Sequence, residues 1–377
     1  MKVLILSCNT GQGHNTAGKA ILETFTARGV DCTMMDTLRL AGEDVSRKVS
    51  GAYCGLTTHF PRGFGWLYKA GGAISNDRVK SPVYYANTTY ARYLLEVIHE
   101  GGYDRVVMPH LFPAEALTWL RRRGDLDVPT YVVGTDYTCI PFWEETEMDH
   151  YLIPHKDLVA EFVKKGVPEE KLVPTGIPVS ARFRTHTSKE EAREQLGLPQ
   201  GKTIYLVMTG SMGFGNAADI GKALLQRGGA VCLLGGNNRK MKDGLRKQFG
   251  ENPRMMVLDF TDQVSLYMDA CDVVLTKPGG LTSTEAAVKN VPLVHTAPIP
   301  GCETINAKFF LKRGMSLCGM DPGRAAAAAK IRDLRLRHGR CYNKTNTIKR
   351  NAMQAEPPNR RTARKHQRKR GKTPCCI

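Results

Sequence analysis

A histidine follows a glycine-rich turn near the start of the sequence. The segment Gly11-Gln12-Gly13-His14 comes directly after an apolar run and just before a helical pattern. The unperturbed pKa of histidine lies near neutrality, so His14 is suited to remove a proton from a hydroxyl group. A capping or hydrogen-bonding role explains the same residue. The glycine spacing does not match the GxGxxG pattern of nicotinamide-dependent enzymes.

A second glycine-rich loop lies at Thr209–Asn216. Gly210 and Gly213 allow tight turning, while Ser211 and main-chain amides can donate hydrogen bonds to a diphosphate. The loop lacks the Lys-Ser/Thr ending of an ATPase P-loop, which disfavours phosphoryl transfer from ATP.

A third motif follows an apolar strand at 272–276. Lys277-Pro278-Gly279-Gly280 precedes Thr282 and Ser283, which we expect to open a helix whose amino terminus holds phosphate. Glu285, expected in the first turn, can accept hydrogen bonds from both ribose hydroxyls. A capping-box glutamate is the alternative, but the combination of glycines, hydroxyls and a carboxylate favours a nucleotide site.

A fourth segment, 297–307, places a carboxylate and an amide three residues apart. We expect Glu303 and Asn306 to lie in a loop. Sugar hydroxyls need both acceptors and donors, which these two side chains supply.

The elements that must position these motifs form two α/β series. In the first, strands at 2–7 and 30–36 flank a helix at 16–28, and further strands are expected at 104–109 and 130–135. The second series starts with a strand at 202–208, and further strands are expected at 230–234, 255–258, 273–276 and 292–295. Two Rossmann-like domains should therefore face one another across a cleft that holds the active site. The boundary falls between about 178 and 200, where Ser188 caps a short helix.

Composition agrees with a two-domain globular enzyme. The chain has 377 residues, 42% of them hydrophobic and 24% charged, and more than one core is the usual solution at this length. No apolar run reaches the roughly 18 residues that span a bilayer. The first residues resemble a buried strand of a cytosolic enzyme rather than a signal peptide. The 11 cysteines form no CxxC pair, so we expect reduced thiols and no metal site.

The positive charge is concentrated at the end of the chain. The net charge is +18, and residues 324–377 contribute 17 Lys/Arg and 2 Asp/Glu, which leaves only +3 for residues 1–323. The segment 323–377 is expected to be a basic tail of altered or disordered sequence. Binding to anionic lipid or to nucleic acid is the alternative for the tail, although no nucleic-acid reader motif is present and no specific nucleic-acid partner is expected.

Residues 41–90 combine glycines, aromatic residues and basic residues. Such a segment suits an anionic bilayer surface at the level of the headgroups. A subdomain that packs its aromatic side chains inward is an equal alternative, and both can hold for different residues.

The ordered set of motifs resembles the family of monogalactosyldiacylglycerol synthases and processive diacylglycerol glucosyltransferases. The matching segments are Gly11–His14, Thr135-Asp136, Thr175–Pro178, Gly210–Gly215, Lys277–Glu285 and Pro298–Ala307. The resemblance covers roughly residues 1–320 and implies the two-domain GT-B fold of glycosyltransferases. The chain is also similar, more distantly, to the N-acetylglucosaminyltransferase of peptidoglycan lipid-intermediate synthesis.

The resemblance implies a division of labour between the domains. Residues 1–180 would receive a diacylglycerol-type lipid, with Gly11 and Gly13 in the acceptor loop and His14 as base or orienting group. Residues 190–322 would hold a UDP-hexose donor, without metal or cofactor and with inversion at the anomeric carbon. The expected donor contacts are Gly210, Ser211, Gly213, Gly279, Gly280, Thr282 and Ser283 for the phosphates, Phe260 and Thr261 for the uracil, Glu285 for the ribose, and Glu303 and Asn306 for the hexose.

Several points stay open at the level of the sequence. Asp136 is a second candidate base, and Asp149 and the pair Glu144-Glu145 are close enough in the sequence to compete with it. Many relatives have Gln in place of Cys302 and Glu in place of Thr304, which leaves the sugar undecided between glucose and galactose. The expected function is hexosyl transfer to diacylglycerol in glycolipid synthesis, by a cytoplasmic protein peripheral to the inner face of the cell membrane. The alternatives are N-acetylglucosaminyl transfer to a polyprenyl-linked peptidoglycan intermediate and UDP-sugar binding by a regulatory protein without turnover.

Overall fold

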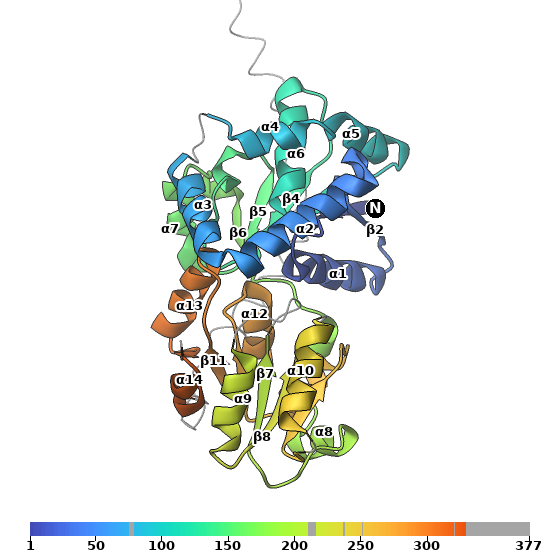
Figure 1. Ribbon diagram of the computed structural model, residues 1–377. Coiled ribbons are helices and arrows are strands. Elements are labelled where there is room, and N and C mark those ends of the chain that lie inside the picture. The colour runs from blue at the N-terminus through green and yellow to red at the C-terminus, as the bar shows by residue number, and fades with distance from the viewer. Residues whose placement is uncertain (75–78, 210–215, 237, 251, 320, 329–377) are drawn as a thin grey trace, which may run out of the picture.

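The chain forms two parallel sheets that each carry six strands. The computed structural model describes residues 1–74, 79–209, 216–236, 238–250, 252–319 and 321–328. The first sheet has the order β2-β1-β3-β4-β5-β6 and the second β12-β11-β10-β7-β8-β9. We call each sheet with its helices a lobe. Figure 1 shows the first lobe above the second.

The first lobe is built from the first half of the chain. Its strands are β1 (Lys2–Ser7), β2 (Asp31–Asp36), β3 (Arg105–Met108), β4 (Thr130–Val133), β5 (His150–Ile153) and β6 (Leu172–Pro174). Its α-helices are α1 (Gln12–Thr26), α2 (Glu43–His59), α3 (Pro61–Ile74), α4 (Pro82–Thr88), α5 (Ala91–Glu100), α6 (Leu111–Arg123) and α7 (Val159–Lys164). Short 3-10 turns are η1 (Thr37–Ala41), η2 (Trp143–Glu145), η3 (Lys156–Leu158), η4 (Glu169–Lys171) and η5 (Ala181–Phe183).

The second lobe repeats the alternation of strand and helix. Its strands are β7 (Ile204–Met208), β8 (Ala230–Leu234), β9 (Met255–Leu258), β10 (Val273–Thr276), β11 (Leu293–His295) and β12 (Leu317–Cys318). Its helices are α8 (Lys189–Gln195), α9 (Ala217–Leu225), α10 (Arg239–Phe249), α11 (Val264–Ala270), α12 (Gly280–Val288), α13 (Cys302–Lys312) and α14 (Pro322–Ala328).

The strands are hydrophobic because helices cover both faces of each sheet. The side chains of β8 are all buried, and those of β1 are buried from Val3 onward. Continuous apolar runs of this kind are typical of parallel strands, whose two faces both lie in a core. The expected α/β fold of two Rossmann-like domains is therefore confirmed, and the strands β1, β8, β9 and β10 have the expected bounds.

Three expected helix boundaries were wrong. Helix α1 begins at Gln12 rather than residue 16, and the first turn tolerates Gly13 because its N–H groups need no partner within the helix. Helix α12 begins at Gly280, so Glu285 lies in the second turn and is not a capping-box residue. Glu303 and Asn306 lie in α13 rather than in a loop.

Three large apolar side chains on α3 and at the junction of α2 and α3 are exposed. The exposed fraction is 62% for Phe60, 77% for Trp66 and 60% for Leu67. Gly63, Gly65 and Gly71 of α3 are buried instead, and a Cβ atom on Gly65 would lie 2.7 Å from Cβ of Pro300. Part of this segment is nevertheless packed inside, because Tyr84 of α4 is buried. Inward packing thus holds for part of residues 41–90, while other large side chains of the segment face solvent.

The first residues of the expected tail are part of the second lobe. Helix α14 covers residues 322–328 and packs against α9, with Ala325 and Ala326 fully buried. An alanine-rich stretch forms helix readily. The rest of the expected tail, residues 329–377, lies outside the described residues. Among the helices that the structure describes, none is long and apolar enough to cross a bilayer.

Candidate active site

His14 lies in the first turn of α1, where its ring is fixed by the neighbouring strand connections. Nδ1 is 2.8 Å from the carbonyl oxygen of Pro109 and 2.9 Å from Oγ1 of Thr135. A carbonyl oxygen only accepts, so Nδ1 carries the hydrogen and the Nε2 atom of the neutral ring keeps its lone pair. Burial lowers the pKa of His14, although the charge of Asp136 and the hydrogen bond to Pro109 oppose that shift. The neutral imidazole is therefore favoured, and Nε2 is the nitrogen that can accept a proton.

His110, which the sequence analysis did not single out, supports His14. Its ring packs edge-on against the His14 ring, with centroids 4.7 Å apart. The Phe112 N–H group donates to Nδ1 of His110 at 3.2 Å, so Nε2–H donates to the Thr10 hydroxyl at 2.7 Å. Burial lowers the pKa of His110 well below its usual value. The signal that could have found it is its place directly after β3, at the sheet edge where His14 also lies.

Asp136 follows β4 at the same edge of the first sheet. Its Oδ1 atom accepts a hydrogen bond of 2.8 Å from the side chain of Asn306, which belongs to the second lobe. The thiol of Cys302 also contacts the Asp136 carboxylate. Asp136 thus lies between the two lobes, within electrostatic reach of His14.

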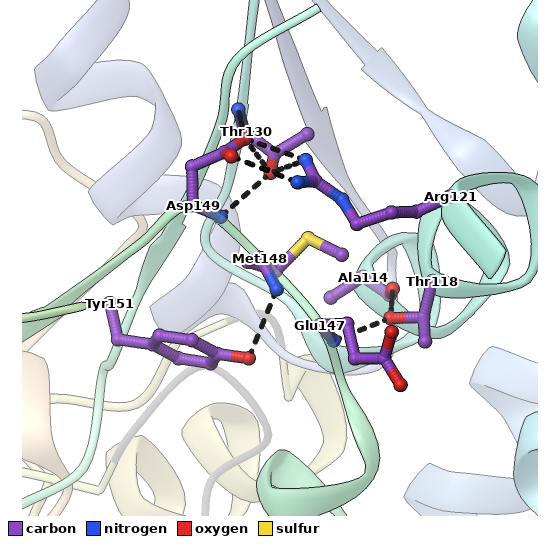
Figure 2. Close-up of polar contacts among 8 residues, drawn as sticks. All are labelled: Ala114, Thr118, Arg121, Thr130, Glu147, Met148, Asp149 and Tyr151. Carbon is purple, nitrogen blue, oxygen red and sulfur yellow. Dashed lines mark hydrogen bonds and ion pairs between the residues drawn. The ribbon is translucent and has the colours of Figure 1, made fainter. Parts of the chain in front are cut away.

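The competing candidate bases lie elsewhere. Figure 2 shows Asp149 bound to Arg121 and Thr130, with Arg121 nitrogens 2.6 and 2.8 Å from its oxygens. Burial alone would raise the pKa of Asp149, but the hydrogen bonds and charge of Arg121, together with Thr130, lower it to about 2. Thr130 begins β4 and Asp149 precedes β5, so this cluster lies at the amino edge of the sheet, opposite Asp136.

Glu144 and Glu145 also interact with other groups of the protein. The Glu145 carboxylate accepts a hydrogen bond of 2.6 Å from the main chain of Ser81. Glu144 forms an ion pair of 3.6 Å with Lys165. Both glutamates are buried. Of the four carboxylates considered, only Asp136 faces the junction of the lobes.

The amino terminus of α12 points at this junction from the second lobe. A Cβ atom on Gly280 would lie 2.0 Å from the carbonyl oxygen of Thr135, so only glycine permits this approach. No side chain caps the helix at Gly279, and the first N–H groups of a helix have no partner within it. Thr282 is partly exposed beside them. Such an end can hold an anionic group.

Ser283, expected to bind phosphate, is bound within the second lobe instead. Its hydroxyl is fully buried and lies 2.9 Å from Nε2 of His295. Its main-chain N–H donates to the carbonyl of Gly279. The Ser283 hydroxyl and N–H group therefore both have partners inside the protein, because this side chain is buried, and neither is free for the expected phosphate contact in this arrangement.

Glu285 is a buried carboxylic acid without a hydrogen-bond partner among the residues that the structure describes. Burial raises the pKa of Glu285 to about 8, and the positive charge of Arg182 only partly opposes this. A carboxylate that is desolvated but not hydrogen-bonded costs free energy. A ligand that donates two hydroxyl groups to it would remove that cost.

Glu303 and Asn306 differ in what they leave free for a ligand. Glu303 pairs with Lys277 through one oxygen and accepts a hydrogen bond of 2.8 Å from the main chain of Ile299 through the other. Asn306 is 0% exposed, and both ends of its carboxamide are bound by protein groups. A sugar therefore cannot reach the Asn306 carboxamide in this arrangement.

The remaining expected residues lie at the loop ends of both sheets. Phe260 follows β9 and is 75% exposed, while the Thr261 hydroxyl accepts a hydrogen bond of 3.1 Å from Gln263. Gly13 has open space where a Cβ atom would be, and Gly11 directly precedes α1. Gly210, Ser211 and Gly213 lie outside the described residues. Among the described residues, no cluster of His, Cys, Asp or Glu could hold a metal ion.

Two facing α/β lobes with the candidate residues at their junction define the GT-B fold. Solved structures agree with this class. The rice protein Os79 in complex with UDP matches with a TM-score of 0.62 at 15% identity, over 98% of this chain and 100% of that one. MurG of Acinetobacter baumannii matches with a TM-score of 0.57 at 14% identity, over 92% and 94%. These likenesses concern the fold.

The sequence comparisons identify the relatives. The monogalactosyldiacylglycerol (MGDG) synthase family model matches residues 14–179. A processive diacylglycerol beta-glucosyltransferase of Bacillus cereus is 26% identical over 320 residues, which is 84% of this chain and 81% of the relative. One from Bacillus cytotoxicus is 27% identical over 323 residues, with the same coverage. The resemblance to this family that the motifs indicated is thus confirmed.

Proposed function

We propose that this chain transfers a hexose, glucose or galactose, from a UDP-sugar to diacylglycerol or a related lipid. The observation that carries the proposal is the His14 ring, whose Nδ1–H is held by Pro109 while Nε2 keeps its lone pair. The amino terminus of α12, suited to a leaving diphosphate, contacts the connection after β4 that also touches His14. The names of the relatives support diacylglycerol as the acceptor.

The reaction needs one proton acceptor and one site for the leaving group. The acceptor hydroxyl loses its proton to Nε2 of His14, with Asp136 as the second candidate, and its oxygen bonds to the anomeric carbon. The bond between that carbon and the diphosphate oxygen breaks, and UDP takes the electron pair. The uncapped N–H groups at Gly280 and Thr282 stabilise the charge on the diphosphate. The loop with Gly210, Ser211 and Gly213 is proposed to hold the same group.

The other parts of the donor are assigned by chemistry. Glu285 would accept hydrogen bonds from the ribose hydroxyls, for which its unpartnered carboxyl group is suited. Phe260 offers an exposed aromatic face to the uracil, with Thr261 beside it. Glu303 would orient the hexose, since Lys277 and Ile299 already fix its carboxylate.

A lipid acceptor requires access to a membrane, and α3 offers a surface for this. Phe60, Trp66 and Leu67 are exposed on or beside this helix, and Arg62 and Lys69 are exposed on it as well. Aromatic side chains next to basic ones suit an anionic headgroup layer. We propose that this surface places the protein at the cytoplasmic face of the membrane, with the first lobe receiving the lipid.

A transfer assay tests the proposal directly. Protein is incubated in mixed micelles with diacylglycerol and radiolabelled UDP-glucose or UDP-galactose, and the extracted lipid is counted. Label in the lipid that is lost in His14→Ala supports the proposal and identifies the sugar.

The contrast arm of the assay uses UDP-N-acetylglucosamine with a polyprenyl-linked acceptor. Label only in that arm would replace the proposed function by the alternative transfer. UDP-sugar binding without label in any lipid would favour a regulatory protein.

A further inference from the structure

The connection after β4 is held by the second lobe at consecutive residues. The Asn306 side chain accepts a hydrogen bond of 2.7 Å from the main-chain N–H of Tyr137. Its Nδ2 group donates to Oδ1 of Asp136 at 2.8 Å and to the carbonyl oxygen of Pro278 at 3.1 Å. One carboxamide therefore joins the acceptor-side residues 136 and 137 to the residue directly before Gly279-Gly280.

We propose that Asn306 is a positioning residue that orients the Asp136 carboxylate and ties it to the donor site. The inference rests on the proposed function, because Asp136 matters only if its carboxylate takes part in the transfer. Asn306 itself touches neither the donor nor the acceptor, since it is fully buried.

The hydrogen-bond inventory of the carboxamide supports this role. The amide nitrogen of asparagine donates twice, and both donors are used by Asp136 and Pro278. The oxygen is occupied by the N–H group of Tyr137, which lies next to Asp136 in the chain. One of these three bonds restrains the Asp136 carboxylate itself, and a second restrains the main chain next to it.

Neighbouring contacts press the same connection against α12. The hydroxyl of Thr284 donates to the carbonyl of Gly280 at 2.7 Å, so it accepts from the Tyr137 hydroxyl at 2.8 Å. The Thr135 carbonyl lies against Gly280. The strand connection that carries Asp136 and the helix end assigned to the diphosphate therefore form one packed unit, in which Asn306 is the link to Asp136.

A double-mutant cycle separates positioning from sugar binding. Asn306→Ala should lower kcat by about 10²-fold, because a misplacement of about 1 Å costs that much, while the KM for the UDP-sugar changes by less than about threefold. In a protein that already carries Asp136→Asn, the same Asn306→Ala change should lower kcat no further. UDP and UDP-hexose should both bind as they bind the unaltered protein.

A matched control variant and a measurement that needs no turnover complete the test. Tyr137→Phe removes the bond to Thr284 in the same contact but leaves Asp136 bonded, so kcat should stay near the original value. Hydrogen exchange of residues 134–142 should quicken in Asn306→Ala, because the Tyr137 amide loses its acceptor, and this readout requires no turnover.

Three results would overturn the positioning role. They are a selective loss of UDP-hexose affinity over UDP, an undiminished effect of Asn306→Ala in the Asp136→Asn protein, and full activity of Asp136→Asn. Each leaves the transfer activity itself intact. Absence of transfer in the unaltered protein would instead sink the proposed function, and with it the catalytic meaning of Asn306.

Discussion

Nδ1–H of His14 donates to the carbonyl oxygen of Pro109 at 2.8 Å, and this bond decides which nitrogen of the ring is basic. Pro109 directly follows β3, and the helix α1 that carries His14 follows the adjacent strand β1. The ends of two adjacent strands therefore fix the tautomer of the ring. Thr135, after the next strand, provides a second contact at 2.9 Å. A ring held on one side presents its other nitrogen in a fixed direction, as general-base catalysis requires.

Replacement of His14 should remove catalysis without removing donor binding. His14→Ala is expected to lower kcat by about 10²–10⁴-fold, the usual contribution of a positioned base, and UDP affinity measured by calorimetry should not change. The matched control Thr135→Val keeps the bond to Pro109 and should cost far less. Comparable losses in both variants would assign the effect to packing rather than to proton transfer.

The pH profile should reflect a histidine that stays neutral in acid. Burial lowers the pKa of His14, so the basic form persists below the ordinary value of about 6.5. The value of kcat/KM should therefore fall to half of its plateau only below about pH 6.5. A profile that has already dropped to half at that pH would contradict a neutral His14 base.

Donor binding should tighten as pH rises towards 8. Burial raises the pKa of Glu285 to about 8, so the free protein holds a proton there at neutral pH. Ribose hydroxyls donate to the ionised form, and binding therefore releases that proton. Calorimetry in two buffers of different ionisation enthalpy should detect the release, and Glu285→Gln should abolish it.

The same carboxyl group should weaken the free protein in alkali. Burial raises the folded-state pKa of Glu285 from its usual 4.5 to about 8, so its contribution to stability is present below about pH 4.5 and lost as pH rises through 8. Glu285→Gln should therefore gain thermal stability relative to the original protein at about pH 9. An equal difference in melting temperature at pH 6 and pH 9 would count against the raised pKa.

A methyl group at position 280 should separate the lobes. Gly280→Ala places Cβ 2.0 Å from the Thr135 carbonyl oxygen, and overpacking of this kind costs about 1–3 kcal/mol. Melting temperature and transfer activity should both fall. Gly244→Ala is the control, because a Cβ atom there meets nothing within 4 Å, and alanine in α10 should stabilise the protein by about 0.5–1 kcal/mol.

Vesicle binding should depend on α3. Trp66→Ser removes a side chain that is 77% exposed and should reduce flotation with vesicles that contain anionic lipid, while activity on micellar acceptor changes less. Tyr93→Ser on α5 is the control, since Tyr93 is 57% exposed and α5 lies on the other side of the first lobe in Figure 1. Equal losses in both variants would show that α3 is not the docking surface.

The sequence by itself determined the fold class and the order of the motifs. Buried strands such as 230–234 and 273–276 are readable because their apolar runs and flanking glycines are local signals. The motifs fall at strand ends, and the carboxyl ends of parallel strands meet at one edge, so a junction of two lobes followed from the chain alone.

Only the tertiary structure decided which side chains are free to act. Ser283 turns to His295, and Asp149 lies with Arg121 at the opposite edge of the sheet from Asp136. Asn306 binds residues about 170 positions away in the chain. The physical reason is that a buried polar side chain forms a hydrogen bond with whichever partner folding brings within about 3 Å. Such partners come from distant segments of the chain, so the local spacing of residues does not indicate them.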